Sequence, residues 1–212
     1  MTAVPSATRG DGAGRPRLAA RAADDAREVA CSLHEPERFG IIFDRYFAEI
    51  HQYIARRLGS DAADDIAAET FLTAFRKRRR FDADRGIVRA WLYGIATNDI
   101  SRYQRRELRA GRAMARTGVP PPDEGHADRV ADRVTAAAAR AELAGALAGL
   151  ARGDREVVLL VALGGLSHAE VAAALGIPYG TVGSRLSRAR RKLRAALGEA
   201  GPAKDEEDNG HG

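Results

Sequence analysis

The sequence predicts an all-α protein with two small helical domains joined by a flexible linker. Apolar residues recur at spacings of three and four from Phe39 onward, which is the pattern of amphipathic helices. A Pro-rich breaker at 119–125 divides this pattern into two halves. We expect five segments: a disordered lead at 1–35, a helical domain at 36–106, a linker at 107–135, a helix-turn-helix domain at 136–198 and a disordered acidic tail at 199–212.

Composition favours a polyanionic partner and excludes several kinds of site. The chain of 212 residues carries 34 Lys and Arg against 29 Asp and Glu, a net charge of +5. Its single cysteine, Cys31, excludes an intrachain disulfide and a cysteine-rich zinc site. The histidines show no ligand spacing, so we expect no metal and no cofactor. No run approaches about eighteen apolar residues, which predicts a cytoplasmic protein without a membrane span.

The first domain begins where a lead poor in large apolar side chains gives way to a strongly amphipathic helix. This helix starts at Phe39 and ends at Gly59. Ser60 or Asp61 can cap the helix that follows. The outward face of the second helix is acidic over its first half, which also suits the helix dipole. The helix runs into five consecutive cations at 76–80.

A third helix is predicted from about Val88, with Trp91 and Ile95 on its core side. Its polar side interleaves arginines with Tyr93 and Tyr103. Aromatic rings stack on exposed bases while arginine neutralises phosphate, so this side is typical of a surface for single-stranded nucleic acid. Trp91 taken alone has a second interpretation, as a core residue of the three-helix unit.

The segment 166–197 has the features of a helix-turn-helix. Ser167 and Glu170 have the spacing of a capping box at a helix start, and Gly176 supplies the left-handed residue that ends the helix. A second helix without any acidic residue begins after Pro178, with one apolar stripe and an opposite stripe of hydroxyls and arginines. Major-groove and phosphate contacts require such a face, although a charged stripe alone is typical of any solvated helix.

Together these motifs resemble those of extracytoplasmic-function (group IV) sigma factors of bacterial RNA polymerase. The first domain carries DAADDIAAETFLTAFR and RAWLYGIATN, and the second carries REVVLLVALGGLSHAEVAAALGIPYGTVGSRLSRARRKL. The resemblance covers about 39–106 and 139–197. It implies two helical domains, called region two and region four in that family. It also implies no catalytic residue, because RNA synthesis is the chemistry of the polymerase.

The resemblance assigns a partner to each surface. Region two would dock on the clamp helices of the polymerase's largest subunit and capture the minus-ten promoter element as melted single strand. Region four would read the minus-thirty-five element as duplex and contact the flap of the second-largest subunit. The family also allows for an anti-sigma partner.

The implied polymerase-binding residues are Asp61, Asp64, Asp65, Glu69 and Leu72. The implied minus-ten residues are Arg80, Arg89, Trp91, Asn98, Tyr103, Arg105 and Arg106. The implied minus-thirty-five residues are Tyr179, Thr181, Ser184, Arg185, Arg188 and Arg191.

The alternative interpretation is a stand-alone helix-turn-helix regulator whose first domain senses a signal or dimerises. Such a regulator binds duplex DNA without polymerase, usually as a dimer on a palindrome. The first domain shows no ligand-pocket pattern and does combine an acidic face with an arginine and aromatic face, which favours the sigma factor. A nucleic-acid enzyme is disfavoured because the sequence shows no metal or nucleophile constellation.

Overall fold

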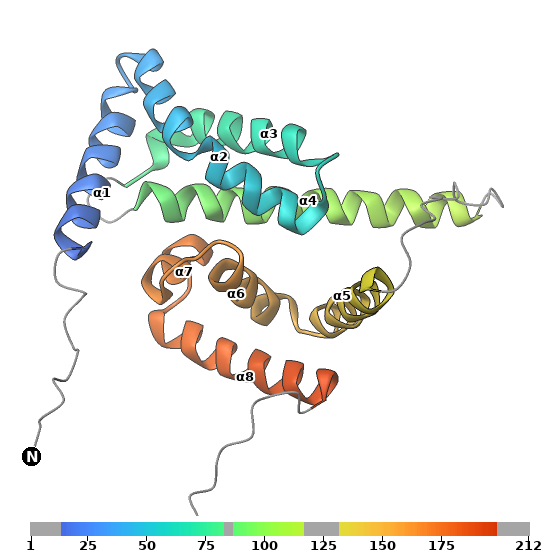
Figure 1. The fold of residues 1–212 in the computed structure, drawn as a ribbon. Helices are drawn as coiled ribbons and strands as arrows, with labels where there is room; N and C mark the ends of the chain where they lie inside the picture. Colours follow the sequence, from blue (N-terminus) through green and yellow to red (C-terminus); the bar gives the residue numbers. More distant parts are fainter. Residues whose placement is uncertain (1–13, 83–86, 117–131, 199–212) are drawn as a thin grey trace, which may run out of the picture.

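The computed structural model describes residues 14–82, 87–116 and 132–198, and every regular element in these ranges is helical (Figure 1). The all-α prediction is therefore confirmed. The N-terminal unit comprises α1 (Gly14–Cys31), η1 (Pro36–Arg38), α2 (Phe39–Leu58), α3 (Ala63–Lys77), η2 (Arg78–Arg80) and α4 (Val88–Arg116). The C-terminal unit comprises α5 (Asp132–Ala148), α6 (Arg152–Ala162), α7 (His168–Leu175) and α8 (Tyr179–Leu197).

The helices within residues 14–82, 87–116 and 132–198 lack the continuous apolar length that a bilayer span requires. The predicted acidic tail at 199–212 and the middle of the predicted linker, 117–131, lie outside the described residues.

Helix α2 begins and ends where the amphipathic pattern of the sequence predicts. Ile42, Ile50 and Ile54 recur at helical spacing and are fully buried, and Gly59 ends the helix with a φ of 89°. The predicted cap of α3 is wrong. Its N-cap is Ala62, whose side chain makes no capping hydrogen bond, while the hydroxyl of Ser60 donates to the neighbouring Asp61 carboxylate.

The prediction of a disordered lead is wrong for residues 14–35, because α1 packs on the N-terminal unit. Val29 joins the hydrophobic core, and Asp25 is also buried. The Asp25 carboxylate accepts hydrogen bonds from the Tyr46 hydroxyl and the Arg45 guanidinium of α2. A segment with few large apolar side chains is thus anchored by charged and polar pairs, which compensate for burial of the carboxylate.

Helix α4 is longer than predicted and carries one misplaced tyrosine. It continues through residues 107–116, inside the expected linker. Residues 105–112 are exposed, so this extension is stabilised by the helical propensity of its Arg-rich sequence and not by packing. Tyr93 was predicted on the polar side but is buried, with its ring centroid 4.8 Å from that of Tyr53.

The helix-turn-helix forms as its local chemistry predicts. The Ser167 hydroxyl accepts from the Glu170 amide at 3.3 Å, and the Ser167 amide donates to the Glu170 carboxylate at 2.9 Å, which completes the capping box. Gly176 ends α7 in the left-handed region at a φ of 61°. The inner stripe of α8 buries Val182, Leu186 and Ala189.

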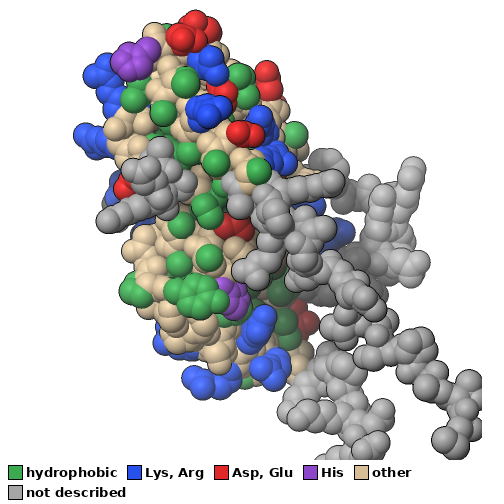
Figure 2. All heavy atoms as spheres, turned by 90° about the vertical axis from the view of Figure 1, so that its left-hand side faces the viewer, with side chains coloured by type: hydrophobic (Ala, Val, Ile, Leu, Met, Phe, Trp, Pro, Cys, Tyr) green, Lys and Arg blue, Asp and Glu red, His purple; other side chains and the backbone are tan. Residues whose placement is uncertain are grey.

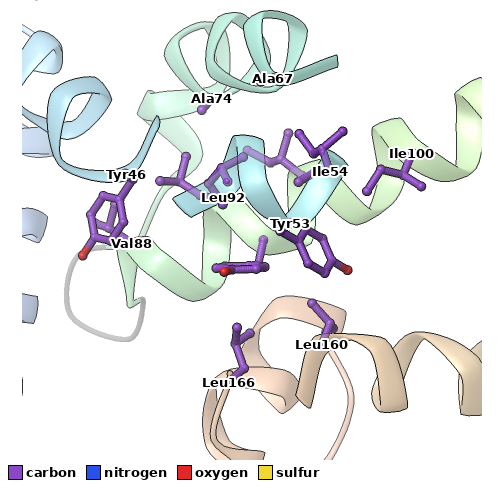
Figure 3. Packing of buried hydrophobic residues seen from close by; sticks show 14 of the residues in the cluster. Tyr46, Tyr53, Ile54, Ala67, Ala74, Val88, Leu92, Ile100, Leu160 and Leu166 are labelled. Atoms are coloured by element: carbon purple, nitrogen blue, oxygen red, sulfur yellow. The ribbon is translucent and has the colours of Figure 1, made fainter. Parts of the chain in front are cut away.

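The two units pack against each other through one shared hydrophobic cluster (Figure 3). Tyr53 of α2 faces Leu160 of α6, and Leu166, which precedes α7, belongs to the same cluster. Helices α4 and α7 lie side by side along this junction. The sequence pattern predicted two units but not that they share a core.

Candidate nucleic-acid interfaces

The recognition helix α8 lies at the edge of the molecule, on the side of the C-terminal unit away from α2 and α3 (Figure 1). Blue Lys and Arg side chains gather at this lower end of the molecule in Figure 2. Four of the six residues predicted to read duplex DNA are exposed, namely Tyr179, Ser184, Arg188 and Arg191. Thr181 and Arg185 are half-buried. The predicted face therefore exists as one exposed stripe on α8.

Arg188 is oriented by a carboxylate that the sequence analysis did not identify. Its Nε and Nη2 donate to the two Asp154 oxygens, each at 2.7 Å, and Asp154 is buried at the start of α6. The Arg188 guanidinium holds the pKa of Asp154 below its usual range. The Arg188 side chain is still 47% exposed, so this bidentate pair fixes its direction without removing it from the surface.

The predicted single-strand surface on α4 is arranged around a cavity. The ring of Trp91 packs on Phe81 with centroids 5.0 Å apart, and Trp91 is half-buried. Arg80, Trp91 and Asn98 line a cavity of about 420 Å³, whose other wall includes Ala173 and Ala174 of α7. The structure thus brings three of the predicted minus-ten residues together. Those further along α4 are Tyr103, which is half-buried, and Arg105 and Arg106, which are exposed.

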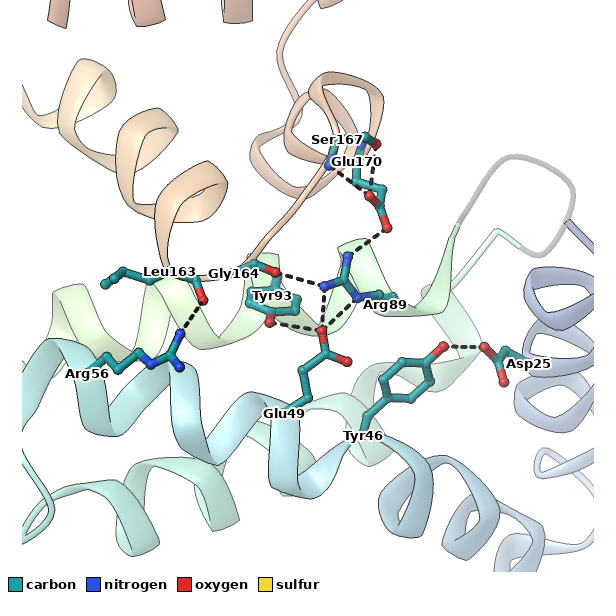
Figure 4. Close-up of polar contacts among 10 residues, drawn as sticks. All are labelled: Asp25, Tyr46, Glu49, Arg56, Arg89, Tyr93, Leu163, Gly164, Ser167 and Glu170. Carbon is teal, nitrogen blue, oxygen red and sulfur yellow. Dashed lines mark hydrogen bonds and ion pairs between the residues drawn. The ribbon is translucent and has the colours of Figure 1, made fainter. Parts of the chain in front are cut away.

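Arg89, also predicted to contact the minus-ten strand, is bound within the protein (Figure 4). Its guanidinium donates to the carboxylates of Glu49 and Glu170, the latter at 3.0 Å, and to the Gly164 carbonyl at 2.8 Å. Burial alone would lower the pKa of Arg89, but these two carboxylates raise it above its usual value. Three acceptors from both units hold this arginine, a situation that no local sequence signal indicates.

The surface that we call the α3 acidic face combines carboxylates with one apolar side chain. It comprises Asp64, Asp65, Glu69 and Leu72 of α3 and Asp61, which precedes the helix. All of these are exposed except Glu69, which is half-buried. Asp64 also lies 2.9 Å from His51 Nε2. Helix α3 lies on the side of the N-terminal unit away from the C-terminal unit (Figure 1).

An aromatic cluster lies next to this face and was missed by the sequence analysis. Phe43 lies on α2 at helical spacing from Phe39 but is 39% exposed, and its ring contacts Phe71 of α3 edge-on at 5.1 Å. Phe47 packs on both rings. The position of Phe43 at the margin of the helical stripe was the available signal. Among the described residues, no group of His, Cys, Asp and Glu could hold a metal ion.

Known families match both units of the chain. Residues 42–110 match the family described as "Sigma-70 region 2", and residues 140–193 match "Sigma-70, region 4". The chain is 32% identical over 185 residues to a probable RNA polymerase sigma-C factor of Mycobacterium bovis, covering 84% of this chain and 95% of that protein. It is 33% identical over 177 residues to the ECF RNA polymerase sigma factor SigL of Mycobacterium tuberculosis, covering 83% and 98%.

Solved structures show the same fold. The structure of CnrH in complex with the cytosolic domain of CnrY matches with a TM-score of 0.55 and 30% identity, covering 83% of this chain and 96% of that one. CnrH is an RNA polymerase sigma factor of Cupriavidus metallidurans. The sigma factor RpoE of Bartonella quintana, solved with the anti-sigma factor NepR, matches with a TM-score of 0.50 and 24% identity over 76% of this chain and 97% of that one.

Proposed function

This chain belongs to the ECF family of RNA polymerase sigma factors, and on that premise we propose which of its surfaces meets each partner. It is a transcription initiation factor that binds core RNA polymerase and promoter DNA. The observation that carries the assignment is the order of the two sigma-70 regions on one chain, each with a surface suited to its role. The chain itself catalyses no reaction and works in the cytoplasm beside the polymerase.

The α3 acidic face is the polymerase-docking surface of region two. This face carries several carboxylates and the exposed Leu72, so it suits a partner surface with cations and an apolar patch. Complementary charge speeds the encounter of two proteins and fixes how they align in the complex. The clamp helices of the largest subunit are that partner. The C-terminal unit contacts the flap of the second-largest subunit, so both units attach to one enzyme.

The α4 surface captures the minus-ten element as melted single strand. Trp91 supplies a ring for base stacking beside the polar Asn98, while Arg80, Arg105 and Arg106 supply positive charge for the backbone. Melted bases expose their stacking faces and Watson–Crick edges, which are hidden in duplex DNA. Region two therefore accepts DNA only where the strands have separated.

Helix α8 reads the minus-thirty-five element in the major groove. Its N-terminal turn presents Tyr179 and Thr181, which is where a recognition helix contacts base edges. Arg185, Arg188 and Arg191 continue the same stripe toward phosphates and guanines. An anti-sigma factor is a further proposed partner, because the structurally similar RpoE of Bartonella quintana was solved with the anti-sigma factor NepR, and CnrH was solved in complex with the cytosolic domain of CnrY.

A DNA footprint with and without core polymerase tests the proposal. We expect protection of two spaced upstream elements only when this chain and core polymerase are both present. A symmetrical footprint on a palindrome, made by a dimer of this chain alone, would instead support the stand-alone regulator.

A further inference from the structure

Both oxygens of the Asp154 carboxylate are bound to one arginine of the recognition helix. Asp154 lies in the first turn of α6 and is 2% exposed, and it pairs with Nε and Nη2 of Arg188 on α8. An acidic residue in a first turn suits the helix dipole, which is the ordinary explanation for its place. The dipole does not require both oxygens to face a side chain 34 residues further along the chain. The pair therefore points to a role of Asp154 in α8 as well as in α6.

The pair uses one edge of the Arg188 guanidinium and leaves another edge for DNA. A guanidinium carries its N–H groups in a fixed plane, one on Nε and two on each Nη. Asp154 takes the Nε hydrogen and one Nη2 hydrogen. The Nη1 hydrogens and the second Nη2 hydrogen are not used by this pair, and the side chain is 47% exposed. The edge formed by Nη1 and Nη2 can therefore donate a pair of parallel hydrogen bonds.

Guanine is the base whose major-groove edge matches this free edge of Arg188. It presents two neighbouring acceptors, N7 and O6, whereas adenine presents one acceptor beside one donor. A base edge has to be met in the plane of the base, while a phosphate accepts hydrogen bonds from many directions. A guanidinium whose plane is fixed before binding loses less side-chain freedom when it meets such an edge. The pairing with Asp154 therefore favours recognition of a base.

Asp154 also compensates the charge that Arg188 would otherwise offer to phosphates. The hydrogen bonds from Arg188 hold the pKa of Asp154 below its usual range, and the positive charges of Arg185 and Lys192 act in the same direction. The carboxylate is therefore ionised at neutral pH. Binding of DNA without regard to sequence depends on cations that neutralise phosphates. A compensated arginine contributes less to that binding, which again favours base recognition.

The neighbouring residue, Gly153, leaves room for a second arginine of the α8 stripe. A Cβ atom on Gly153 would lie 2.7 Å from Nη1 and 3.0 Å from Cζ of Arg185. The Arg185 guanidinium thus lies directly against the backbone of the first α6 turn. Two consecutive residues of α6 determine where two arginines of α8 lie.

We propose that the first turn of α6 positions the reading arginines of α8: Asp154 holds Arg188 with its free edge toward a guanine of the minus-thirty-five element, and Gly153 leaves the space in which Arg185 lies. The proposal rests on the assignment of α8 to that duplex. It goes further, because it names the base and places the selecting residues outside the helix-turn-helix. Asp154 is buried, so it acts as a positioning residue that does not contact DNA itself.

A binding selection with the complete complex tests the proposal. Core polymerase with each variant of the full chain is bound to a pool of promoter duplexes whose upstream segment is randomised, and the bound fraction is sequenced. The variants are Asp154→Asn, which keeps the side-chain shape and removes its charge, Arg188→Ala, and the two combined. Glu142→Gln removes the same charge at an exposed site of the C-terminal unit and is the matched control. Thermal unfolding reports whether each variant is folded.

We expect Arg188→Ala to remove a preference for guanine at one base pair. Asp154→Asn should lower the preference at that base pair about tenfold, a typical value for one well-oriented bidentate contact. It should have no further effect once Arg188 is alanine, because it acts through that arginine. It should also steepen the salt dependence of binding to duplex without a promoter by about one counterion, since the Arg188 charge is then uncompensated. Glu142→Gln should match the unsubstituted chain.

Gly153→Ala provides a second route that leaves the pair of Asp154 and Arg188 intact. The added methyl group displaces the end of a flexible side chain, and alanine favours the helix more than glycine does, so α6 stays folded. We expect this variant to lower the preference at the base pair that Arg185→Ala identifies and to leave the base pair of Arg188 unchanged.

Several results would overturn the proposal. If Asp154→Asn left the guanine preference unchanged while Arg188→Ala removed it, Asp154 would be a structural residue of α6. If Asp154→Asn changed preferences at other base pairs, it would not act through Arg188. A preference of Arg188 for another base would exclude the guanine contact, and an unchanged selection by Gly153→Ala would exclude the positioning of Arg185. If the unsubstituted complex selected no sequence at all, the proposed function itself would fail.

Discussion

Helices α4 and α8 carry similar residues and are both assigned to promoter DNA, yet they stand in opposite surroundings. On α8 the predicted stripe is exposed, and Arg188 is aimed by a carboxylate of its own unit. On the N-terminal unit, Arg80, Trp91 and Asn98 line an open cavity to which α7 contributes Ala173 and Ala174, and Arg89 of α4 is held by Glu170 from across the junction. The duplex-reading stripe thus lies within the C-terminal unit alone, whereas the surface assigned to the single strand borders both units.

The same difference is visible in two arginines. The Arg188 side chain is 47% exposed even though its Nε and Nη2 pair with Asp154, whereas that of Arg89 is 23% exposed and all three of its nitrogens donate to acceptors within the protein. A charged side chain on a predicted DNA-binding face therefore has to be judged by its acceptors, since residue type alone does not show whether it is free to bind phosphate.

The largest effect is expected from breaking the buried ion pair of Arg57 on α2 and Glu156 on α6, which holds the junction. Arg57→Met leaves the Glu156 carboxylate buried without its partner and should lower the free energy of unfolding by about 3–5 kcal/mol. Adding Glu156→Leu should restore most of that loss, because two apolar side chains then meet. Urea denaturation measures both, with Arg109→Met at an exposed site as the control. Equal losses for Arg57→Met and Arg109→Met would contradict this account of the junction.

Polymerase docking should be independent of that junction. The pair Asp65→Arg and Glu69→Arg reverses charge on the α3 acidic face and should weaken core polymerase binding by about 3 kcal/mol, roughly a hundredfold, without loss of helix content. Surface plasmon resonance with immobilised core polymerase measures the affinity. The pair Asp24→Arg and Glu37→Arg changes charge equally at exposed sites elsewhere. If the two double variants weakened binding alike, net charge rather than this face would be responsible.

Recognition of the upstream duplex should depend on α8 alone. Arg185→Ala and Arg188→Ala should each weaken binding of the minus-thirty-five duplex by the polymerase complex by about 1–3 kcal/mol. Arg188→Ala should also lower stability, since Asp154 loses its bidentate partner. Arg190→Ala, exposed on the same helix but outside the stripe, is the control. Unchanged promoter choice in both variants would refute the assigned stripe.

The smallest effect is expected in the core of the N-terminal unit. Burial raises the pKa of Asp99 despite the exposed Arg102, whose Nη2 lies 3.4 Å from Asp99 Oδ1, because that oxygen is buried without a hydrogen-bond partner. Because the pKa of Asp99 is higher in the folded chain than in the unfolded chain, Asp99 contributes its full stability at pH values below its unfolded-state pKa. That contribution is lost as the pH rises through its folded-state pKa. Asp99→Asn should therefore stabilise the protein by about 1 kcal/mol at pH 7 and give no gain at pH 3. Thermal unfolding at both pH values checks this, and a gain that persists at pH 3 would exclude the ionisation as its cause.

Local chemistry explains what the sequence could predict. The capping box of Ser167 and Glu170, the left-handed Gly176 and the stripe of α8 all depend on residues within one or two turns of each other. Their arrangement follows from helix geometry and needs no tertiary information. The acidic stripe of α3 could likewise be predicted from the sequence, because its residues are spaced within a few turns of one helix.

Long-range pairing explains what the sequence could not predict. Arg57 and Glu156 are 99 residues apart, Arg89 and Glu170 are 81 apart, and no local periodicity links either pair. Tyr93 was placed on a polar face because its burial requires the C-terminal unit. Helix α1 was missed because polar pairs from Asp25 to α2 anchor it, and composition-based reasoning counts such residues as solvated.

Run-off transcription on a pool of genomic promoter fragments tests the central claim most directly. Core polymerase is assayed with and without this chain, and the transcripts are sequenced. We predict transcripts that start at discrete positions and share two spaced upstream elements, only when the chain is present. If the chain left the start sites of core polymerase unchanged, it would not act as a promoter-specificity factor, and both DNA-binding assignments would need another explanation.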